Sequence, residues 1–187
     1  MKKIIFIVIY FIVLQASAQN SAVIKGSFSA AKETEIRLMG FIGTKDTLLA
    51  QTKTDALGNF LLQYPKKYKG AASLQVKETT NLIVLLNNEN VEISWSNFKD
   101  FSVLQFTNSQ ENQAFQQAYT INMDAQKKLA GLTYLLPFYK NDLSKKELTA
   151  QLEQEINIEK SRFEAYLNKL PHTSYAKAYL RYRALLQ

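Results

Sequence analysis

The clearest catalytic spacing in the sequence joins Ser174 to Lys177, in the order Ser-Tyr-Ala-Lys. Penicillin-recognising serine enzymes use this S-x-x-K spacing, in which a lysine one helical turn after the serine can activate it. The sequence has no S-D-N or K-T-G partner motif, and Ser29 with Lys32 repeats the same spacing in a strand or loop. We therefore interpret Ser174 as the cap of a helix and Lys177 as its solvated neighbour.

Histidine and aspartate offer little further chemistry. His172 is the only histidine, and it follows Pro171, where a helix should end. No acidic or nucleophilic motif can be paired with it, so we expect a histidine in a loop. Asp46, Asp55 and Asp100 lie beside predicted turns, where aspartate side chains bond backbone N–H groups. They lack the regular Asp/Asn/Gly spacing of a calcium loop.

The composition excludes several catalytic classes. None of the 187 residues is cysteine and one is histidine, so disulfides, thiol catalysis, thiolate metal sites and a three-histidine zinc site are excluded. Lys plus Arg total 23 against 16 for Asp plus Glu, but these charges are scattered and form no basic arm. The sequence therefore predicts no enzyme, with no catalytic, cofactor-binding or metal-binding residues, and no nucleic-acid partner.

A glycine pair marks one loop. The stretch from Gly40 to Lys45 reads Gly-Phe-Ile-Gly-Thr-Lys and has the G-x-x-G pattern with which KH domains clamp a nucleic-acid backbone between two helices. Here the flanking segments have strand patterns. We therefore interpret it as a loop whose glycines permit unusual backbone angles.

Aromatic and basic residues alternate near the C-terminal end of the sequence. Such a mixture could stack bases, bind an acidic partner, or pack its rings on a neighbouring helix with its charges in water. We expect Tyr179 to pack within the chain. Tyr182 and Arg183 are the main candidates for docking a partner, because tyrosine and arginine are favoured at interface centres. Tyr179 is a third, weaker candidate.

The first residues have the layout of a secretory signal. Lys2 and Lys3 precede eleven apolar residues, Ile4 to Leu14, and small residues follow, ending in Ala18. Eleven apolar residues are too few to span a bilayer, which takes roughly 20. We predict that residues 1–18 are a signal peptide. The mature chain, with a net charge of +5, would be exported to the periplasm or cell envelope, without a lipid anchor or stable membrane insertion.

The segment from Ser21 to Thr107 has the two-residue period of β-strands. Segments such as "EIRL", "NFLLQY" and "NVEISW" alternate apolar and polar side chains, and "NLIVLL" should be covered on both faces. About eight strands fit into this segment. Asp55-Ala56-Leu57-Gly58 has the composition of a hairpin loop, in which Gly58 supplies a positive φ. We predict an antiparallel β-sandwich over residues 19–107, with Trp95 in its core.

The period becomes helical after Thr107, so residues 108–187 should form a subdomain of about three helices in an α+β chain. Asn108 with Glu111, and Ser144 with Glu147, have the spacing of helix-capping pairs. The predicted apolar stripes are listed here: Phe115, Ala118, Ala125, Leu129, Leu132 and Leu136 on the first helix; Leu148, Leu152, Ile156, Phe163, Leu167 and Leu170 on the second; Tyr175, Ala178, Tyr179, Tyr182 and Leu186 on the third. Asn122 interrupts the first stripe, and Pro137 and Pro171 should close the first two helices.

The order of these segments resembles a known family. "VIKGSF", "EIRLMG", "DTLLAQTKTDALGNFLLQY", "NLIVLLNNENVEISW" and "TNSQENQAFQQAY" are similar to the N-terminal domain of unknown function in exported Bacteroidetes thiol-disulfide oxidoreductases. In that family the domain precedes a thioredoxin-like domain of the TlpA/ResA or AhpC/TSA type. Its catalytic W-C-x-x-C motif is missing here, so no catalytic residue carries over.

The resemblance implies a non-catalytic, exported accessory or interaction module, whose partner would be a thioredoxin-like domain or another envelope protein. Two alternatives remain open. The chain could be a stand-alone ligand-binding β-sandwich protein of the cell envelope, or a fragment of a longer oxidoreductase whose catalytic part is missing. A gene that continued past Gln187 into a W-C-x-x-C segment would distinguish these readings.

Overall fold

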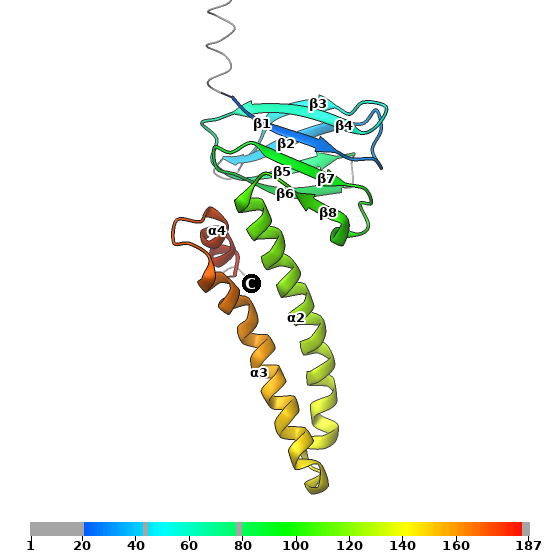
Figure 1. The fold of residues 1–187 in the computed structure, drawn as a ribbon, viewed down its shortest axis with the longest axis vertical. Coiled ribbons are helices and arrows are strands. Elements are labelled where there is room, and N and C mark those ends of the chain that lie inside the picture. The colour runs from blue at the N-terminus through cyan, green and yellow to red at the C-terminus, as the bar shows by residue number, and fades with distance from the viewer. Residues whose placement is uncertain (1–20, 43–44, 78–79, 185–187) are drawn as a thin grey trace, which may run out of the picture. The chain divides into compact units, whose positions relative to one another are not determined.

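The computed structural model describes residues 21–42, 45–77 and 80–184 (Figure 1). The predicted signal peptide, residues 1–18, lies outside the described residues. The chain divides into two compact units, residues 1–113 and 114–187. The first unit holds two four-stranded sheets, and three α-helices follow, which confirms the predicted α+β fold. The division falls within helix α2 (Gln110–Lys140), whereas the sequence pattern changes at Thr107.

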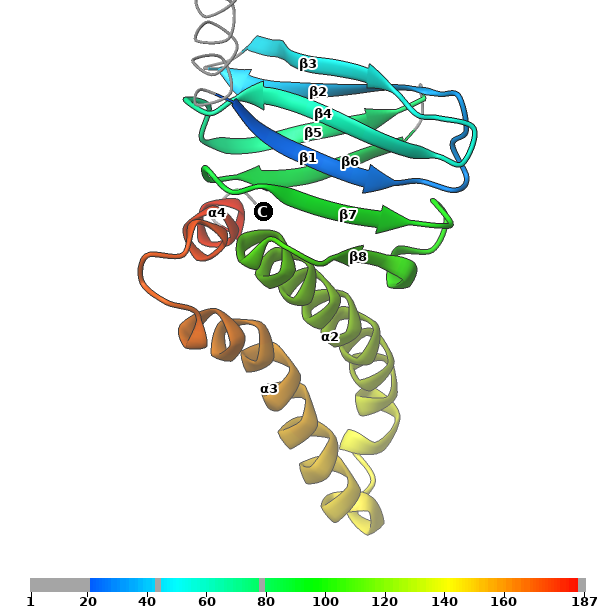
Figure 2. The same cartoon turned by 45° about the horizontal axis from the view of Figure 1, so that its top comes forward.

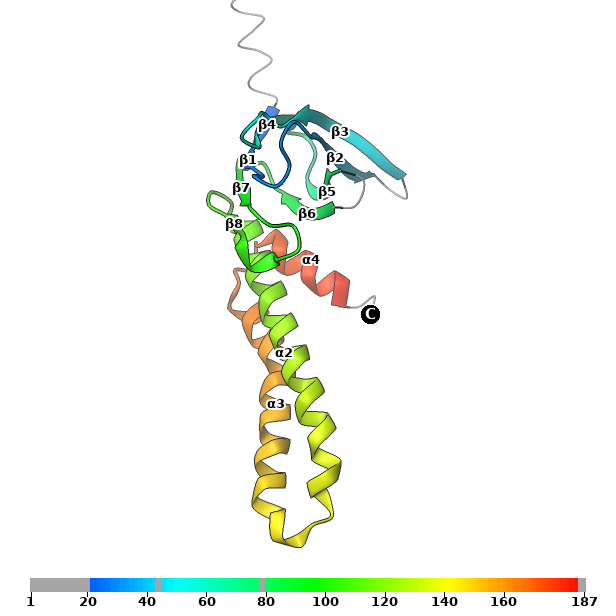
Figure 3. The same cartoon turned by 90° about the vertical axis from the view of Figure 1, so that its right-hand side faces the viewer.

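Eight strands are found in the described residues. They are β1 (Ser21–Ser27), β2 (Glu35–Ile42), β3 (Lys45–Lys53), β4 (Asn59–Pro65), β5 (Gly70–Val76), β6 (Thr80–Leu86), β7 (Val91–Trp95) and β8 (Leu104–Phe106). One sheet has the order β4-β1-β7-β8 and the other β3-β2-β5-β6, seen side by side in Figure 3. All pairs are antiparallel except β1 with β7, which is parallel.

The core lies between the two sheets and is built as the alternation predicts. In β2, Ile36 and Leu38 are fully buried, whereas Glu35 and Arg37 on the other face are exposed. At one end of the core the aromatic rings gather: Trp95 contacts the rings of Phe98 and Phe101, and its indole N–H donates to the Asp100 carbonyl oxygen at 3.0 Å. Trp95 is therefore a core residue, as predicted.

The turn from Asp55 to Gly58 differs from the predicted hairpin. Gly58 has the expected positive φ of 90°, but β3 and β4 belong to different sheets, so the turn carries the chain across the sandwich. The Asp55 carboxylate closes it by accepting hydrogen bonds from the N–H groups of Leu57 and Asn59, each at 2.8 Å. These bonds hold the pKa of Asp55 below its usual range. The turn residues therefore specify a tight reversal of the chain but do not determine which strand β4 pairs with.

The start of α2 is fixed by side chains that the sequence did not single out. Ser109, one residue after the predicted cap Asn108, accepts the Asn112 backbone N–H at 3.2 Å and is the true cap. The fully buried Asn112 side chain accepts the N–H of Leu85 at 2.7 Å and donates to its carbonyl oxygen at 2.8 Å. Leu85 lies in β6, an edge strand, so Asn112 takes the place of a neighbouring strand there.

Glu89 also lies at this helix start. Its carboxylate accepts the Ser109 hydroxyl, and the N–H groups of Gln110 and Glu111 favour its charge. Burial acts in the opposite sense and is larger, so the pKa of Glu89 is raised. The carboxylate therefore satisfies free N–H groups in the first turn of α2, where negative charge is favourable.

The remaining helices are α3 (Lys146–Lys169) and α4 (Tyr175–Ala184), with 3-10 turns at Phe101–Val103 and Leu143–Lys145. In Figure 2, α2 and α3 form a helical hairpin. The predicted stripes of both helices face inward, with Phe115, Ala125 and Ile156 buried. Burial declines toward the end where α2 gives way to α3: Leu132 and Leu136 are half-buried and Leu148 is exposed.

Two further predicted helix boundaries are wrong. Pro137 lies inside α2, in its last turn, where it removes the bond that its own N–H would make to the fourth residue before it and its ring crowds the carbonyl of that residue. The helix ends three residues later. Ser144 does not cap α3. Asp142 instead caps a short 3-10 turn by accepting the Ser144 N–H at 2.9 Å and hydroxyl at 2.7 Å, and α3 continues from that turn.

A charge cluster with one buried carboxylate joins α2 to α3. Glu159 lies on the inward face of α3, where its carboxylate contacts the Lys128 ammonium at 2.6 Å and the Arg162 guanidinium at 3.2 Å. The hydrogen bond from Lys128, and secondarily that from Arg162, lowers the pKa of Glu159 although burial opposes the shift. The charged form is therefore the one that stabilises the hairpin.

This cluster predicts a loss of helical-unit stability in acid. A lowered pKa in the folded state gives stability that is present above the unfolded pKa of glutamate, about 4.3, and is lost as the pH falls through the folded value. We expect the thermal midpoint of the helices, followed by circular dichroism, to fall below this pH. Glu159→Gln should remove much of the pH dependence and lower stability at neutral pH. Glu155→Gln, at an exposed site on α3, should change neither.

Candidate docking site

The predicted Ser-Lys pair is a helix cap. The Ser174 hydroxyl oxygen accepts the Lys177 backbone N–H at 3.2 Å, at the start of α4, which confirms the capping interpretation. Lys177 is not solvated as predicted: its side chain is buried, and its ammonium donates to the Leu170 carbonyl oxygen at 2.8 Å. The ammonium therefore satisfies a free carbonyl near the end of α3 instead of activating the serine.

The inward face of α4 is rotated from the predicted one. Ala176, Lys177 and Leu180 are buried, whereas Ala178 and Tyr182 are exposed, Tyr182 by 61% of its surface. The predicted stripe assumed that lysine would avoid the interior. Because a carbonyl oxygen receives the Lys177 ammonium, the helix can bury that side instead.

The three candidate docking residues have different surroundings. Tyr179 is half-buried, with its ring 5.7 Å from that of Phe115 and 6.4 Å from that of Tyr175. Tyr182 and Arg183, three and four residues further along the same side of α4, are exposed. The structure therefore separates a ring that packs within the helical unit from two side chains that a partner could reach.

A small hollow adjoins Arg183. It has a volume of about 190 Å³ and lies between α2, α3 and α4. Its lining residues are Phe115, Tyr119, Asn122, Phe163, Leu180, Arg183 and Ala184. Tyr182 and Tyr179 are not among them.

The lining of this hollow suits one apolar side chain next to an acidic group. A cavity of roughly 150 Å³ can admit a benzene molecule, so 190 Å³ has room for one large apolar side chain. Arg183 adds a permanent positive charge and Asn122 an amide at the wall. We call these seven residues the α4 hollow. Apolar anchors beside an arginine are typical of the energetic centres of protein interfaces.

Sequence reasoning found Arg183 and missed the other residues of the α4 hollow. Phe115 and Phe163 were expected in the core of the helices, and nothing in their spacing distinguishes a wall from a filled interior. The one available signal was Asn122. A polar residue that interrupts an apolar stripe can mark a place where the packing is incomplete.

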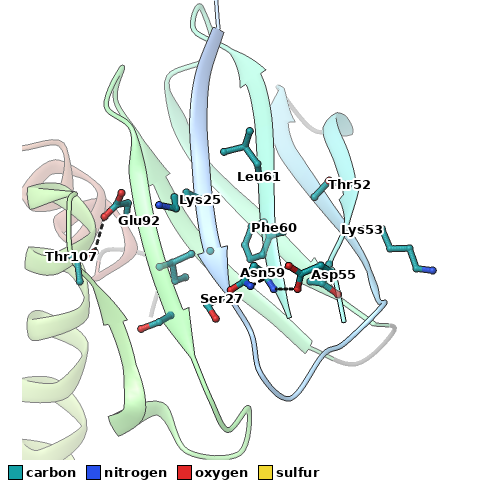
Figure 4. Close-up of a pocket in the computed structure, with 14 residues that line it drawn as sticks. Lys25, Ser27, Thr52, Lys53, Asp55, Asn59, Phe60, Leu61, Glu92 and Thr107 are labelled. Atoms are coloured by element: carbon teal, nitrogen blue, oxygen red, sulfur yellow. Dashed lines mark hydrogen bonds between the residues drawn. The ribbon is translucent and has the colours of Figure 1, made fainter. Parts of the chain in front are cut away.

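The outer face of the sheet that contains β1 carries a second, shallower depression, shown in Figure 4. Its volume is about 660 Å³ and it is open to solvent. Lys25 lies between Leu61 on β4 and Glu92 on β7, which are its direct neighbours in the sheet. The Thr107 hydroxyl donates to the Glu92 carboxylate at 3.3 Å. The depression thus presents both polar and apolar surface, with one lysine and one glutamate adjacent.

The remaining candidate residues have structural roles or none. His172 is exposed between α3 and α4. Asp100 accepts the Ser102 hydroxyl at 2.6 Å and backbone N–H at 2.9 Å, which lowers the pKa of the carboxyl. Gly40 lies in β2, and Gly43 lies outside the described residues. Within residues 21–42, 45–77 and 80–184, no group of three or more histidine, aspartate or glutamate side chains could hold a metal ion.

Comparisons with known proteins do not assign this chain to a family. No family model matches the sequence, and no curated protein matches it. Among solved structures, a 9R-lipoxygenase from Cyanothece matches over 66% of this chain and 25% of its own, with 13% identity and a TM-score of 0.30. This chain therefore spans about a quarter of that protein's length, and a TM-score so low says nothing about shared fold or activity.

Proposed function

We propose that the protein is a non-catalytic, exported interaction module that docks a protein partner at the α4 hollow. The observation that carries this proposal is the hollow itself, a space for one apolar side chain next to the exposed Arg183. The resemblance to the domain that precedes a thioredoxin-like domain suggests such a domain, or another envelope protein, as the partner. The partner surface would present an apolar side chain and an adjacent carboxylate.

The walls of the hollow are well supported before any partner binds. Lys177 ties α4 to the end of α3, and the Arg181 guanidinium donates to the Asn168 side-chain oxygen at 2.9 Å. The ring of Tyr179 packs on Phe115 at the start of α2. A site whose walls are already ordered loses little conformational entropy on binding, which favours affinity.

Substitutions on α4 should separate docking from folding. We expect Tyr182→Ala and Arg183→Glu to leave the melting temperature almost unchanged, because both side chains are exposed. Arg183→Glu should weaken co-precipitation with a purified thioredoxin-like domain of an exported oxidoreductase, and Tyr182→Ala, next to the hollow but not lining it, should weaken it less. Tyr179→Ala, at a half-buried ring, should instead destabilise the helical unit by about 2 kcal/mol.

Lys160→Glu on the exposed side of α3 serves as the charge-matched control and should leave co-precipitation unchanged. Equal losses for Lys160→Glu and Arg183→Glu would show that net charge, and not this site, governs binding. Normal co-precipitation by the Arg183→Glu protein would rule out docking at the α4 hollow.

The sheet depression favours a second candidate function, a stand-alone ligand-binding β-sandwich. Lys25 and Glu92 could orient a small polar ligand there, while the exposed Leu61 offers an apolar contact. The α4 hollow is preferred because it is more enclosed and its volume suits one side chain, whereas the depression is wider and more open to solvent.

A further inference from the structure

Large apolar side chains are exposed where α2 gives way to α3. They are Tyr134, exposed by 69% of its surface, Leu135 by 42%, Phe138 by 66%, Leu143 by 79% and Leu148 by 37%. We call these five residues the apolar tip. The rings of Tyr134 and Phe138, one turn apart on α2, are in contact with centroids 5.4 Å apart. Such a concentration of exposed apolar groups marks a binding surface and not an ordinary solvated end.

The apolar tip is exposed because the hairpin has no third wall there. The contacts of α4 are with the start of α2 and the end of α3, through Tyr179, Lys177 and Arg181. At the other end of the hairpin, α2 and α3 bury only the side chains that face each other. The chain reverses there within the few residues between Lys140 and Lys146. The apolar tip therefore lies at the turn end of the hairpin, where its side chains are exposed.

Lysines surround the apolar tip. Lys140, Lys145 and Lys146 are all exposed, and they outnumber the acidic Asp142 and Glu147. The Asp142 carboxylate is occupied in the turn by the Ser144 N–H and hydroxyl. Protruding Phe, Leu and Tyr side chains with lysine at their border are typical of surfaces that enter the boundary between lipid headgroups and acyl chains, because lysine stems extend back to the anionic headgroups.

We propose that the apolar tip binds an anionic lipid surface reversibly, with Phe138 and Leu143 inserted and Lys140, Lys145 and Lys146 on the headgroups. A fluid lipid surface accommodates exposed apolar side chains of any arrangement, and the neighbouring exposed lysines match its anionic headgroups. No helix of the described residues is long and apolar enough to span a bilayer. This surface is separate from the α4 hollow, and the proposal does not depend on docking there.

Vesicle co-sedimentation tests the proposal. Residues 19–187 should pellet with vesicles of phosphatidylcholine containing phosphatidylglycerol, and much less with phosphatidylcholine alone. The double variant Phe138→Ser/Leu143→Ser should weaken binding at least tenfold, since burying each such side chain is worth about tenfold or more in affinity. Lys145→Glu/Lys146→Glu should weaken binding to the anionic vesicles in particular. Leu57→Ser, at a similarly exposed apolar residue in a sandwich turn, is the control and should bind as the wild type does.

A second readout separates insertion from simple charge attraction. A tryptophan introduced by Leu143→Trp should shift its fluorescence to shorter wavelength when anionic vesicles are added, while the buried Trp95 contributes a constant background. Full binding by Phe138→Ser/Leu143→Ser, or no fluorescence shift, would overturn the proposal. Self-association of the wild type that the same double variant abolished, without any vesicle binding, would assign the apolar tip to a second copy of the chain instead.

Discussion

Replacing Asn112 with alanine should lower the free energy of unfolding of the sandwich by about 3 kcal/mol. The substitution removes both hydrogen bonds to the Leu85 backbone and leaves a buried N–H and a buried carbonyl without partners. Each unsatisfied buried group costs about 1 to 3 kcal/mol, so the two outweigh any gain in helix propensity. Urea unfolding followed by circular dichroism measures the change.

Asn108→Ala is the matched control, four residues earlier and exposed. The sequence pattern assigned the helix cap to Asn108, whereas the structure assigns it to Ser109, so this variant should change stability by less than about 0.5 kcal/mol. The Leu85 amide should also exchange with solvent faster in the Asn112→Ala protein than in either other protein. A large loss for Asn108→Ala with little loss for Asn112→Ala would contradict the structure of this segment.

Replacing Gly58 with alanine should cost about 3 kcal/mol. Gly58 has a φ of 90°, which side-chain-bearing residues rarely adopt, and an added Cβ would lie 2.3 Å from the Phe28 carbonyl oxygen. Because the obstruction is backbone, the turn itself must move, and with it the bond from the Phe28 N–H to the Gly58 carbonyl oxygen at 2.8 Å. Strain and displacement each contribute roughly 1 to 3 kcal/mol.

Gly131→Ala is the informative counterpart. Gly131 lies inside α2, and nothing stands within 4 Å of an added Cβ. The same substitution should therefore stabilise the helical unit by about 0.5 to 1 kcal/mol, because alanine restricts the unfolded chain and favours the helix. Thermal unfolding of both variants should show opposite signs. Matching destabilisation would indicate that backbone conformation is not what distinguishes the two glycines.

The strands and the core could be predicted because their signal is local. Alternation in "EIRL" and "NFLLQY" places Ile36, Leu38, Phe60 and Leu62 inside, as observed. The partner of each strand could not be predicted in this way. Asp55 and Gly58 specify a reversal through bonds within the turn, and those bonds are compatible with a hairpin or with a crossing between sheets. Which one forms depends on the pairing of β4 with β1, residues far away in sequence.

The helix ends show a different limit. A cap requires an oxygen within reach of a free N–H, and Asn108, Ser109 and Asp142 all carry one, so spacing alone cannot choose among neighbours. The face of α4 was misplaced because Lys177 counts as polar in any periodic pattern. Its burial depends on the free carbonyl of Leu170, which becomes available only once α3 has ended and the chain has turned.

The candidate docking residues were partly predictable. Composition pointed to Tyr182 and Arg183, and both are exposed. The hollow next to Arg183 needs Phe115 and Phe163 from two other helices, and a gap in packing leaves no trace in the periodicity of any one helix. The apolar tip was hidden for a similar reason. In the sequence, Phe138 and Leu143 look like ordinary core residues. Only the structure shows that no third helix of the described hairpin covers them.

The position of β1 in its sheet has a consequence for the order in which the chain can fold. β1 is the first described strand, yet it lies between β4 and β7, and Ile24 pairs with both Leu62 and Val91. A growing chain therefore cannot pair β1 on both of its sides until β7 has been synthesised, and such long-range pairing slows folding. If the first residues direct export, slow formation of this sheet would keep the chain unfolded long enough to pass through a translocation channel.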